Sequence, residues 1–347
     1  MIHVLKKAAR LCLAPALAAA LAASPAAAQY AGEVNVYSAR KEALIKPLLD
    51  RFAEETGVRV NLVTAEADQL HERLAAEGRN SPADLFITAD VANLHRAREA
   101  GLLQPVDDAA LRAAIPAAYR DPEGYWYGLS LRARVIVYAK DRVEARALST
   151  YEDLADPRWA GRVLVRSSGN TYNQSLIAAM IVAHGEDAAE AWARGLAANF
   201  ARRPSGGDTD QIRAVAAGEG DVALVNTYYY GRLAISDDAG ERAIADKTAL
   251  FFPNQDGRGT HVNVSGAGVA AHAPNADNAR RLLAFLASTE GQRMFAELNQ
   301  EYPVDPSVPR SAVVRSWGAF KADDLALTKL GELNGAAIRL ADRAGWP

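Results

Sequence analysis

Strand-like and helix-like segments alternate along the first third of the chain, and this alternation limits the fold more than any other feature of the sequence. Runs rich in β-branched and apolar residues are followed by stretches whose apolar residues recur with a helical period. In chain order, these segments are 33–37, 42–55, 58–63, 68–76, 84–88 and 91–100. Such an order predicts an α/β protein with a mostly parallel sheet that is flanked by helices.

A long strand-like run at 125–140 separates this region from a second set of segments. The second set comprises strands 162–165 and 221–226 and helices 173–183, 188–201, 211–217, 277–287 and 291–299. The glycine-bearing run 264–268 indicates a turn or a bulge.

This organisation fits two α/β lobes joined by crossing strands, with a ligand cleft between the lobes. The length of the chain also suits two domains. We expect an N-terminal lobe of residues 29–131 plus about 258–306, and a C-terminal lobe of residues 132–257 plus about 307–347.

The N-terminus carries the features of a signal peptide. Lys6, Lys7 and Arg10 precede an apolar run at 11–23, which is followed by small residues that suit a cleavage site. We therefore expect residues 1–28 to be removed and the mature protein to be periplasmic. No later run reaches the roughly 20 apolar residues that a transmembrane helix needs, so we expect no membrane insertion of the mature chain.

Composition and missing motifs disfavour several functions. The single cysteine, Cys12, lies in the leader, so the mature chain has neither a disulfide nor a thiolate metal site. The net charge of −3 argues against nucleic acid as a partner. The motifs of metalloproteases, serine hydrolases, phosphate-binding loops and EF-hands do not occur. A hydrolase using Ser167 or Ser168 with His261 would lack a recognisable catalytic constellation, so we expect no enzyme.

Three adjacent tyrosines, Tyr228, Tyr229 and Tyr230, follow the strand predicted at 221–226, and ligand sites of α/β proteins gather at such strand ends. One interpretation is that the rings pack on two faces and place their hydroxyl groups at the surface. The other is a metal site. A phenol with a pKa near 10 is a poor ligand for divalent ions, whereas a trivalent cation displaces its proton and binds the phenolate. Three phenolates would neutralise Fe³⁺.

A second polar segment, 166–175, also lies between a predicted strand and a predicted helix. In one interpretation, its Tyr172 faces the tyrosine cluster. In the other, Ser168 or Thr171 caps the helix and Tyr172 lies on the helix surface.

Arginines form a third element of the candidate site. Arg40 follows the first strand, whereas Arg132 and Arg134 are two residues apart in the long strand-like run and therefore share one face of it. Arginine suits the binding of a planar oxyanion, and a surface salt bridge is the alternative for each of the three.

Together these segments resemble, over nearly the whole predicted mature chain, the periplasmic ferric-ion-binding proteins of ABC iron importers. The matching stretches are 36–40, 83–88, 132–136, 166–175, 226–230, 261–268, 301–304 and 340–346. The resemblance implies a type II periplasmic binding protein with a transferrin-like Fe³⁺ site that is closed by hinge motion of two lobes. It also implies Tyr172, Tyr228 and Tyr229 as metal ligands and Tyr230 as a noncoordinating aromatic residue.

The resemblance further implies a carbonate or bicarbonate anion that completes the iron coordination, held by Arg40 and Arg132, with Arg134 as the alternative in register. Some family members place a His and a Tyr directly after the Tyr-Ser-x-Arg segment, where this chain has Lys41 and Glu42. We therefore expect the three-tyrosine, anion-assisted subtype and keep Glu42 as a candidate for a direct or water-mediated contact.

By this resemblance, the chain is expected to act as a monomer that captures Fe³⁺ and delivers it to the permease of an inner-membrane ABC importer. The alternative is a binding protein of the same fold for an oxyanion or a small organic acid, because a fold alone does not determine its ligand. That alternative leaves the three tyrosines without a metal.

Overall fold

The first lobe is built around three parallel strands. In the computed structural model, which describes residues 31–347, its elements are β1 (Glu33–Ser38), α1 (Glu42–Thr56), β2 (Arg59–Thr64), α2 (Ala67–Glu77), β3 (Leu85–Thr88), α3 (Val91–Glu99), β4 (Leu103–Gln104) and α4 (Ala109–Ala114). Strand β1 pairs in parallel with β2 on one side and with β3 on the other, which confirms the predicted opening. The predicted signal peptide, 1–28, lies outside the described residues.

The second lobe repeats the α/β pattern with more helices. Its elements are β6 (Val163–Leu164), α5 (Thr171–His184), α6 (Glu186–Ala198), α7 (Asp208–Ala217), β7 (Val222–Asn226), α8 (Thr227–Ala234), α9 (Ala239–Lys247) and β8 (Thr248–Phe251). Strands β6 and β7 pair in parallel, and β7 is buried along its whole length. Helix α8 begins directly after β7, so the tyrosine cluster lies in the first turns of a helix.

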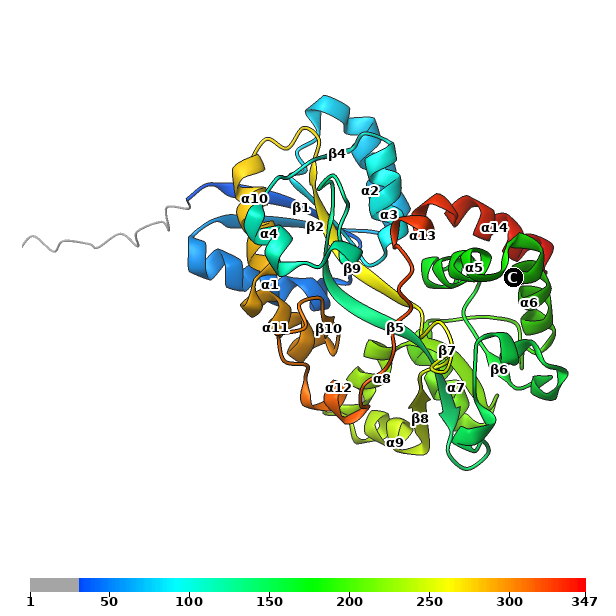
Figure 1. Cartoon of the computed structure of the whole chain (residues 1–347). Helices are drawn as coiled ribbons and strands as arrows, with labels where there is room; N and C mark the ends of the chain where they lie inside the picture. Colours follow the sequence, from blue (N-terminus) through cyan, green and yellow to red (C-terminus); the bar gives the residue numbers. More distant parts are fainter. Residues whose placement is uncertain (1–30) are drawn as a thin grey trace, which may run out of the picture.

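Two long strands, β5 (Tyr127–Ala139) and β9 (Val262–Ala270), connect the lobes. The first part of β5 pairs with β9, and its second part pairs with β7 and β8, all in antiparallel orientation. Figure 1 shows β5 running from one lobe into the other. The parallel pairing predicted for the sheet is therefore present in β2-β1-β3 and β6-β7, whereas the strands that cross between the lobes pair antiparallel.

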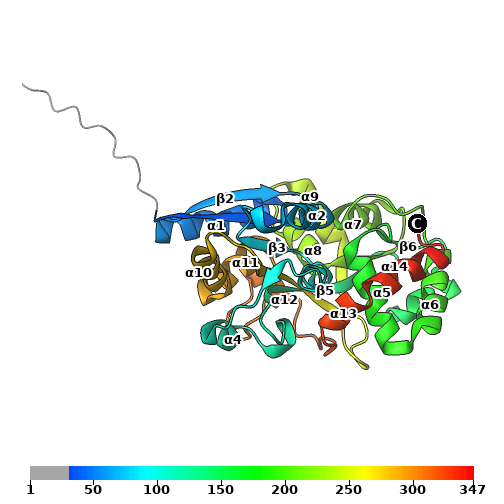
Figure 2. The same ribbon diagram turned by 90° about the horizontal axis from the view of Figure 1, so that it is seen from above.

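The last part of the chain packs on both lobes. Its helices and strand are α10 (Ala276–Ala287), α11 (Thr289–Asn299), β10 (Tyr302–Pro303), α12 (Ala312–Ser316), α13 (Thr328–Glu332) and α14 (Asn334–Arg343). Helices α10 and α11 pack against α1, α14 packs against α5 and α6, and α13 contacts both α3 and α5 (Figure 1). Seen from above, the lobes lie side by side, with α1 and α10 at one end and α6 at the other (Figure 2). Within residues 31–347, no helix is both long and apolar enough to cross a membrane.

The glycine-bearing run 264–268 is not a turn; of the two alternatives predicted from sequence, the bulge is the one that has a counterpart in the structure. The run lies inside β9, whose residues are all buried, and the register shift sits opposite, between Gly128 and Ser130 of β5. A Cβ atom on Gly266 would lie 2.6 Å from the carbonyl oxygen of Tyr127, and one on Gly268 would lie 2.6 Å from that of Tyr125. These glycines therefore allow the close approach of a neighbouring backbone.

Candidate metal centre

Tyr172 is positioned by the start of α5. The side chain of Asn170 accepts a hydrogen bond of 3.2 Å from the backbone N–H of Tyr172 and thereby caps the helix. The capping residue is thus Asn170, and neither Ser168 nor Thr171 has this role. The cap places Tyr172 in the first turn of α5, where its half-buried ring points toward the start of α8 and its hydroxyl reaches that of Tyr228.

The start of α8 positions Tyr228 and Tyr229. Both side chains are buried, and their ring centroids lie 4.2 Å apart with a tilt of 30°. The hydroxyl oxygens of Tyr172 and Tyr228 are 3.1 Å apart, which is hydrogen-bonding distance. Two helix starts from separate parts of the chain therefore bring phenolic oxygens together, although these residues are 56 positions apart in the sequence.

Tyr230 points away from this group. Successive residues of a helix are separated by about 100°, so three adjacent tyrosines cannot share one face. The hydroxyl of Tyr230 donates to the backbone carbonyl oxygens of Ala245, at 3.0 Å, and Thr248, at 2.9 Å. Its role is to pack α8 against the segment around α9 and β8.

A Tyr230→Phe variant tests this separation of roles. We expect it to bind metal as the wild type does, while the free energy of unfolding falls by about 1 kcal/mol because a buried hydrogen bond is lost. Denaturant unfolding and metal titration of the same sample measure both quantities. A large loss of metal binding would show that Tyr230 belongs to the site.

The three tyrosines Tyr172, Tyr228 and Tyr229 line one cavity of about 170 Å³. Residues of both lobes line it: Arg40, Lys41, Glu66 and Asp90 from the first lobe, and Arg166 and Asn170 from the second. The cavity therefore lies in the cleft that the sequence predicts between the lobes. Glu42 is exposed and does not line it, so the structure does not bring this candidate to the tyrosines.

Arg40 is fixed deep in the first lobe beside this cavity. Its Nη2 donates to Glu301 Oε1 at 2.9 Å, and its Nη1 donates to the hydroxyl of Ser265. Its Nε is buried without a hydrogen-bond partner in the described part of the chain. Glu301 is itself held by the hydroxyl of Ser130 at 2.7 Å, and it lines the same cavity. Arg40 is thus held rigidly at the wall of the tyrosine cavity, with donor capacity left over.

The structure separates the other two predicted arginines. Arg132 donates a hydrogen bond of 3.1 Å from Nη1 to Ser265, and its guanidinium carbon lies 5.5 Å from the ring centroid of Tyr172. It therefore contacts residues of the site but does not line the cavity. Arg134 is buried and donates to Asp208 at 2.7 Å and to Asn173 at 2.7 Å. Its role in the structure is therefore to join the starts of α5 and α7.

Arg166, and not Arg134, lies beside the tyrosines. It lines the tyrosine cavity, its guanidinium carbon lies 5.5 Å from the ring centroid of Tyr172, and its Nε is buried without a hydrogen-bond partner within residues 31–347. The stretches 166–175 and 301–304 both match the family, but neither Arg166 nor Glu301 is among the site residues predicted from the sequence. The useful signal for Arg166 was its place at the end of a strand; for Glu301, which follows a helix, local sequence offers none.

The chemistry of the cavity favours a trivalent cation. Burial, with the neighbouring phenols as a second cause, raises the pKa of Tyr228 well above its ordinary value, and burial likewise raises the pKa of Tyr229. Both phenols are therefore neutral at pH 7 when no metal is bound, and only a strongly polarising cation displaces their protons. No group of three or more His, Cys, Asp or Glu side chains in the described residues is placed to hold a metal ion.

The structure gives no support to a serine nucleophile. No hydrogen bond within the described residues joins His261 to Ser167 or Ser168. Burial, together with the charges of Arg134 and Arg258, lowers the pKa of His261 to about 3. An imidazole with so low a pKa is a poor general base near neutral pH.

Known proteins share this architecture. Residues 80–319 match the family described as bacterial extracellular solute-binding protein. The chain is 50% identical over 314 residues to the iron uptake protein A1 of Synechocystis sp., covering 90% of this chain and 87% of that protein. It is 31% identical over 335 residues to the major ferric iron-binding protein of Neisseria meningitidis serogroup B, covering 95% and 97% of the two chains.

Solved structures of named iron-binding proteins share the fold of this chain. A Trichodesmium protein named IdiA or FutA, in complex with iron and citrate ligands, superposes with a TM-score of 0.86 and 51% identity, covering 91% of this chain and 100% of that one. The ferric binding protein from Campylobacter jejuni gives a TM-score of 0.88 and 39% identity, covering 90% and 100%. The chain therefore belongs to the family of bacterial extracellular solute-binding proteins.

Proposed function

We propose that this protein captures Fe³⁺ in the periplasm and delivers it to the permease of an inner-membrane ABC importer. The observation that carries the proposal is the convergence of Tyr172, Tyr228 and Tyr229 on one cavity between the lobes. The names of the relatives, which include an iron uptake protein and a ferric iron-binding protein, support the same cargo. Iron is the transported substrate here and not a resident cofactor.

The three tyrosines are proposed as the protein ligands. Their phenolates together balance the charge of Fe³⁺, and an oxygen donor set suits a small, highly charged cation. Binding of Fe³⁺ to the three phenols releases three protons, and the electric field of the metal supplies the free energy for their release. Some family members place a His after the Tyr-Ser-x-Arg segment, where this chain has Lys41. We therefore propose that an anion, and not a side chain of the first lobe, fills the coordination positions of Fe³⁺ that the three tyrosines leave open.

A carbonate or bicarbonate ion is proposed as that anion, bound beside Arg40 with Arg166 on the other side of the cavity. The spare donor capacity of these two arginines supports the proposal, because buried donors without partners are rare in folded proteins. Arg132 is proposed to act indirectly, through the hydroxyl of Ser265 that it shares with Arg40.

An Arg40→Gln variant tests the anion. We expect the affinity for Fe³⁺ in bicarbonate buffer to fall by about 10- to 100-fold, as is typical when an outer partner of a metal site is removed. The dependence of iron binding on bicarbonate concentration should also weaken. Arg51→Gln, a change at an exposed arginine of α1, serves as the control. An unchanged bicarbonate dependence would contradict the proposed anion site.

Transport would follow from movement of the lobes. The strands β5 and β9 are the connections about which a hinge can act, and opening would expose the bound iron to the importer. We propose that the protein works as a monomer, with lobes close to the predicted boundaries.

Binding measurements with different ligands test the function itself. Equilibrium dialysis against Fe³⁺ with bicarbonate should show one saturable site per chain, and dialysis against phosphate, sulfate or a small organic acid without iron should show none at the same concentrations. Saturable binding of one of these anions, with no retention of iron, would contradict the proposal and favour an oxyanion or organic acid as cargo.

A further inference from the structure

A pocket of about 290 Å³ lies beside the strands that connect the lobes, and we name it the hinge pocket. Its lining includes Leu131 and Arg132 of β5 and Val262 of β9. Strand β5 pairs with β9 as far as Ala133 and with β7 from Arg134 onward, so it changes partners directly after the residues that line the pocket. A molecule in the hinge pocket therefore contacts the chain where the lobes can move relative to each other.

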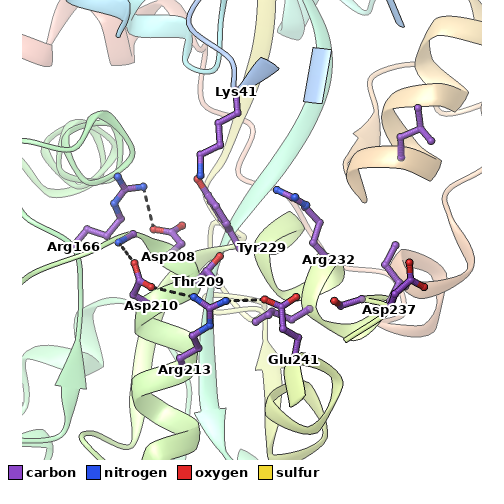
Figure 3. Close-up of a pocket in the computed structure, with 15 residues that line it drawn as sticks. Lys41, Arg166, Asp208, Thr209, Asp210, Arg213, Tyr229, Arg232, Asp237 and Glu241 are labelled. Carbon is purple, nitrogen blue, oxygen red and sulfur yellow. Dashed lines mark hydrogen bonds and ion pairs between the residues drawn. The ribbon is translucent and has the colours of Figure 1, made fainter. Parts of the chain in front are cut away.

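The hinge pocket is separate from the cleft that contains the tyrosines. Around Tyr229 the cleft continues into a space of about 590 Å³. Figure 3 shows Lys41 reaching toward Tyr229 in this space, with Arg166 on one side of the tyrosine and Arg232 on the other. The residues that line the hinge pocket line neither this space nor the tyrosine cavity. A ligand of the hinge pocket therefore does not occupy the position proposed for iron and its anion.

The walls of the hinge pocket are rich in flat rings and come from both lobes. The aromatic and proline residues of the lining are Pro116, Tyr119, Tyr302, Pro303, Pro306 and Phe320. Tyr302 belongs to β10, which pairs with β5 in the first lobe. Phe320 stacks at 4.4 Å on Phe252, which directly follows β8 of the second lobe. The rings of Tyr302 and Phe320 lie 5.3 Å apart at 73°, and such an edge-to-face arrangement suits a further aromatic ring.

The charged side chains of the lining favour an anionic group. Arg310 is exposed, its guanidinium carbon lies 5.1 Å from the ring centroid of Tyr302, and it forms no ion pair within residues 31–347. Arg132 is buried and faces Asp90 at 3.6 Å. Asp305, the carboxylate of the lining, already accepts a backbone N–H of its own loop at 2.8 Å. Arg310 is thus a cation with donors available for a carboxylate.

Tyr302 adds a hydrogen-bonding group that the protein does not use. Its hydroxyl is buried and has no hydrogen-bond partner in the described part of the chain. Burial raises the pKa of Tyr302, so its phenol is neutral and can donate a hydrogen bond. Buried polar groups without partners are rare in folded proteins. An oxygen acceptor on a bound molecule would satisfy this hydroxyl.

We propose that the hinge pocket is a second binding site, which takes a small planar aromatic carboxylate. The aromatic ring of the ligand packs among Tyr119, Tyr302 and Phe320, and its carboxylate pairs with Arg310. Because the walls belong to both lobes, lobe movement changes the shape of the pocket, and binding there is coupled to binding of iron in the cleft. The site itself does not depend on the proposed function, whereas the coupling does.

Isothermal titration calorimetry of the iron-free protein with three probes tests the site. Benzoate has both recognised groups, cyclohexanecarboxylate lacks the aromatic ring, and benzyl alcohol lacks the charge. We expect benzoate to bind at one site per chain and cyclohexanecarboxylate to bind more weakly. Benzyl alcohol should bind about 10-fold more weakly than benzoate, the loss expected for one charge-assisted hydrogen bond. Absence of benzoate binding would overturn the proposal.

An Arg310→Gln variant places the binding in the hinge pocket. It should weaken benzoate binding by about 10-fold and leave the affinity for Fe³⁺ in bicarbonate buffer unchanged when benzoate is absent. Arg315→Gln is the matched control, because Arg315 is an exposed arginine of α12 that forms no ion pair within the described residues and does not line the pocket. Wild-type affinity for benzoate in Arg310→Gln, with loss of binding in Arg40→Gln, would place benzoate in the cleft and contradict the proposal.

Titration of the iron-loaded protein in excess bicarbonate tests the coupling. We expect the dissociation constant of benzoate to differ by about fivefold or more between the iron-loaded and iron-free forms, the lower end of typical coupling between two sites. Equal dissociation constants would overturn the coupling. Failure of the proposed function has a different signature, since the protein would then retain no iron in bicarbonate buffer, while benzoate binding would still depend on Arg310.

Discussion

Replacing Tyr228 with phenylalanine should lower the affinity for Fe³⁺ by more than about 100-fold, the upper end of the loss seen when only an outer partner of a metal site is removed. The change deletes one phenolate oxygen and keeps the ring that packs on Tyr229 at 4.2 Å. It also removes the hydroxyl that contacts Tyr172 at 3.1 Å. Competition with a chelator of known iron affinity, at fixed pH and bicarbonate concentration, measures the loss.

Tyr230→Phe is the matched control for this experiment. It deletes the same atom from the neighbouring residue of the same helix, where the hydroxyl is bonded to backbone carbonyl groups instead. Equal losses of iron affinity in the two variants would mean that the effect comes from disturbing α8 and not from losing a ligand.

Replacing Arg134 with methionine should lower the free energy of unfolding by about 3 kcal/mol, because it removes the hydrogen-bonded cation of the buried Asp208 carboxylate and leaves Arg166, at 3.6 Å, as the remaining cation beside it. The side chains of both residues are almost fully buried, so water cannot replace the lost partner. Asp208 also accepts a hydrogen bond of 2.7 Å from the backbone N–H of Asn226, directly before the tyrosine helix. Denaturant unfolding of the iron-free protein measures the change.

Arg213→Met provides the comparison for this stability effect. Arg213 also pairs with two carboxylates, Asp210 and Glu241, but its side chain is largely exposed, and such pairs contribute about 0–1 kcal/mol. If both variants lost the same small amount of stability, Arg134 would not be the structural residue that its burial indicates.

The sequence was sufficient to predict the alternating elements of the first lobe and the two-lobe α/β architecture. Alternating periodicity locates strands β1 to β3 and their helices, because each buries one face in a regular pattern. The antiparallel pairing of β5 and β9 was not predictable, since a strand that crosses between lobes has the same local pattern as one that stays in a lobe. The glycines of β9 likewise have the composition of a turn, and only their neighbours show that they allow close packing.

The candidate site was predictable where several polar residues are adjacent in the chain and unpredictable where partners are distant. Tyr228 and Tyr229 could be found by their position after a buried strand. The contact of Arg40 with Glu301 joins residues 261 positions apart, and no local pattern reveals it. Arg132 and Arg134 share a face of β5 as expected, yet the structure separates their roles, because Asp208 and Asn173 lie within reach of Arg134.

An absorption spectrum of the purified protein, loaded with Fe³⁺ in bicarbonate buffer, tests the tyrosine site most directly. We predict a visible phenolate-to-iron charge-transfer band that weakens or shifts in Tyr172→Phe and in Tyr228→Phe but not in Tyr230→Phe. The absence of a visible band at saturating iron would contradict the ferric assignment of this cavity.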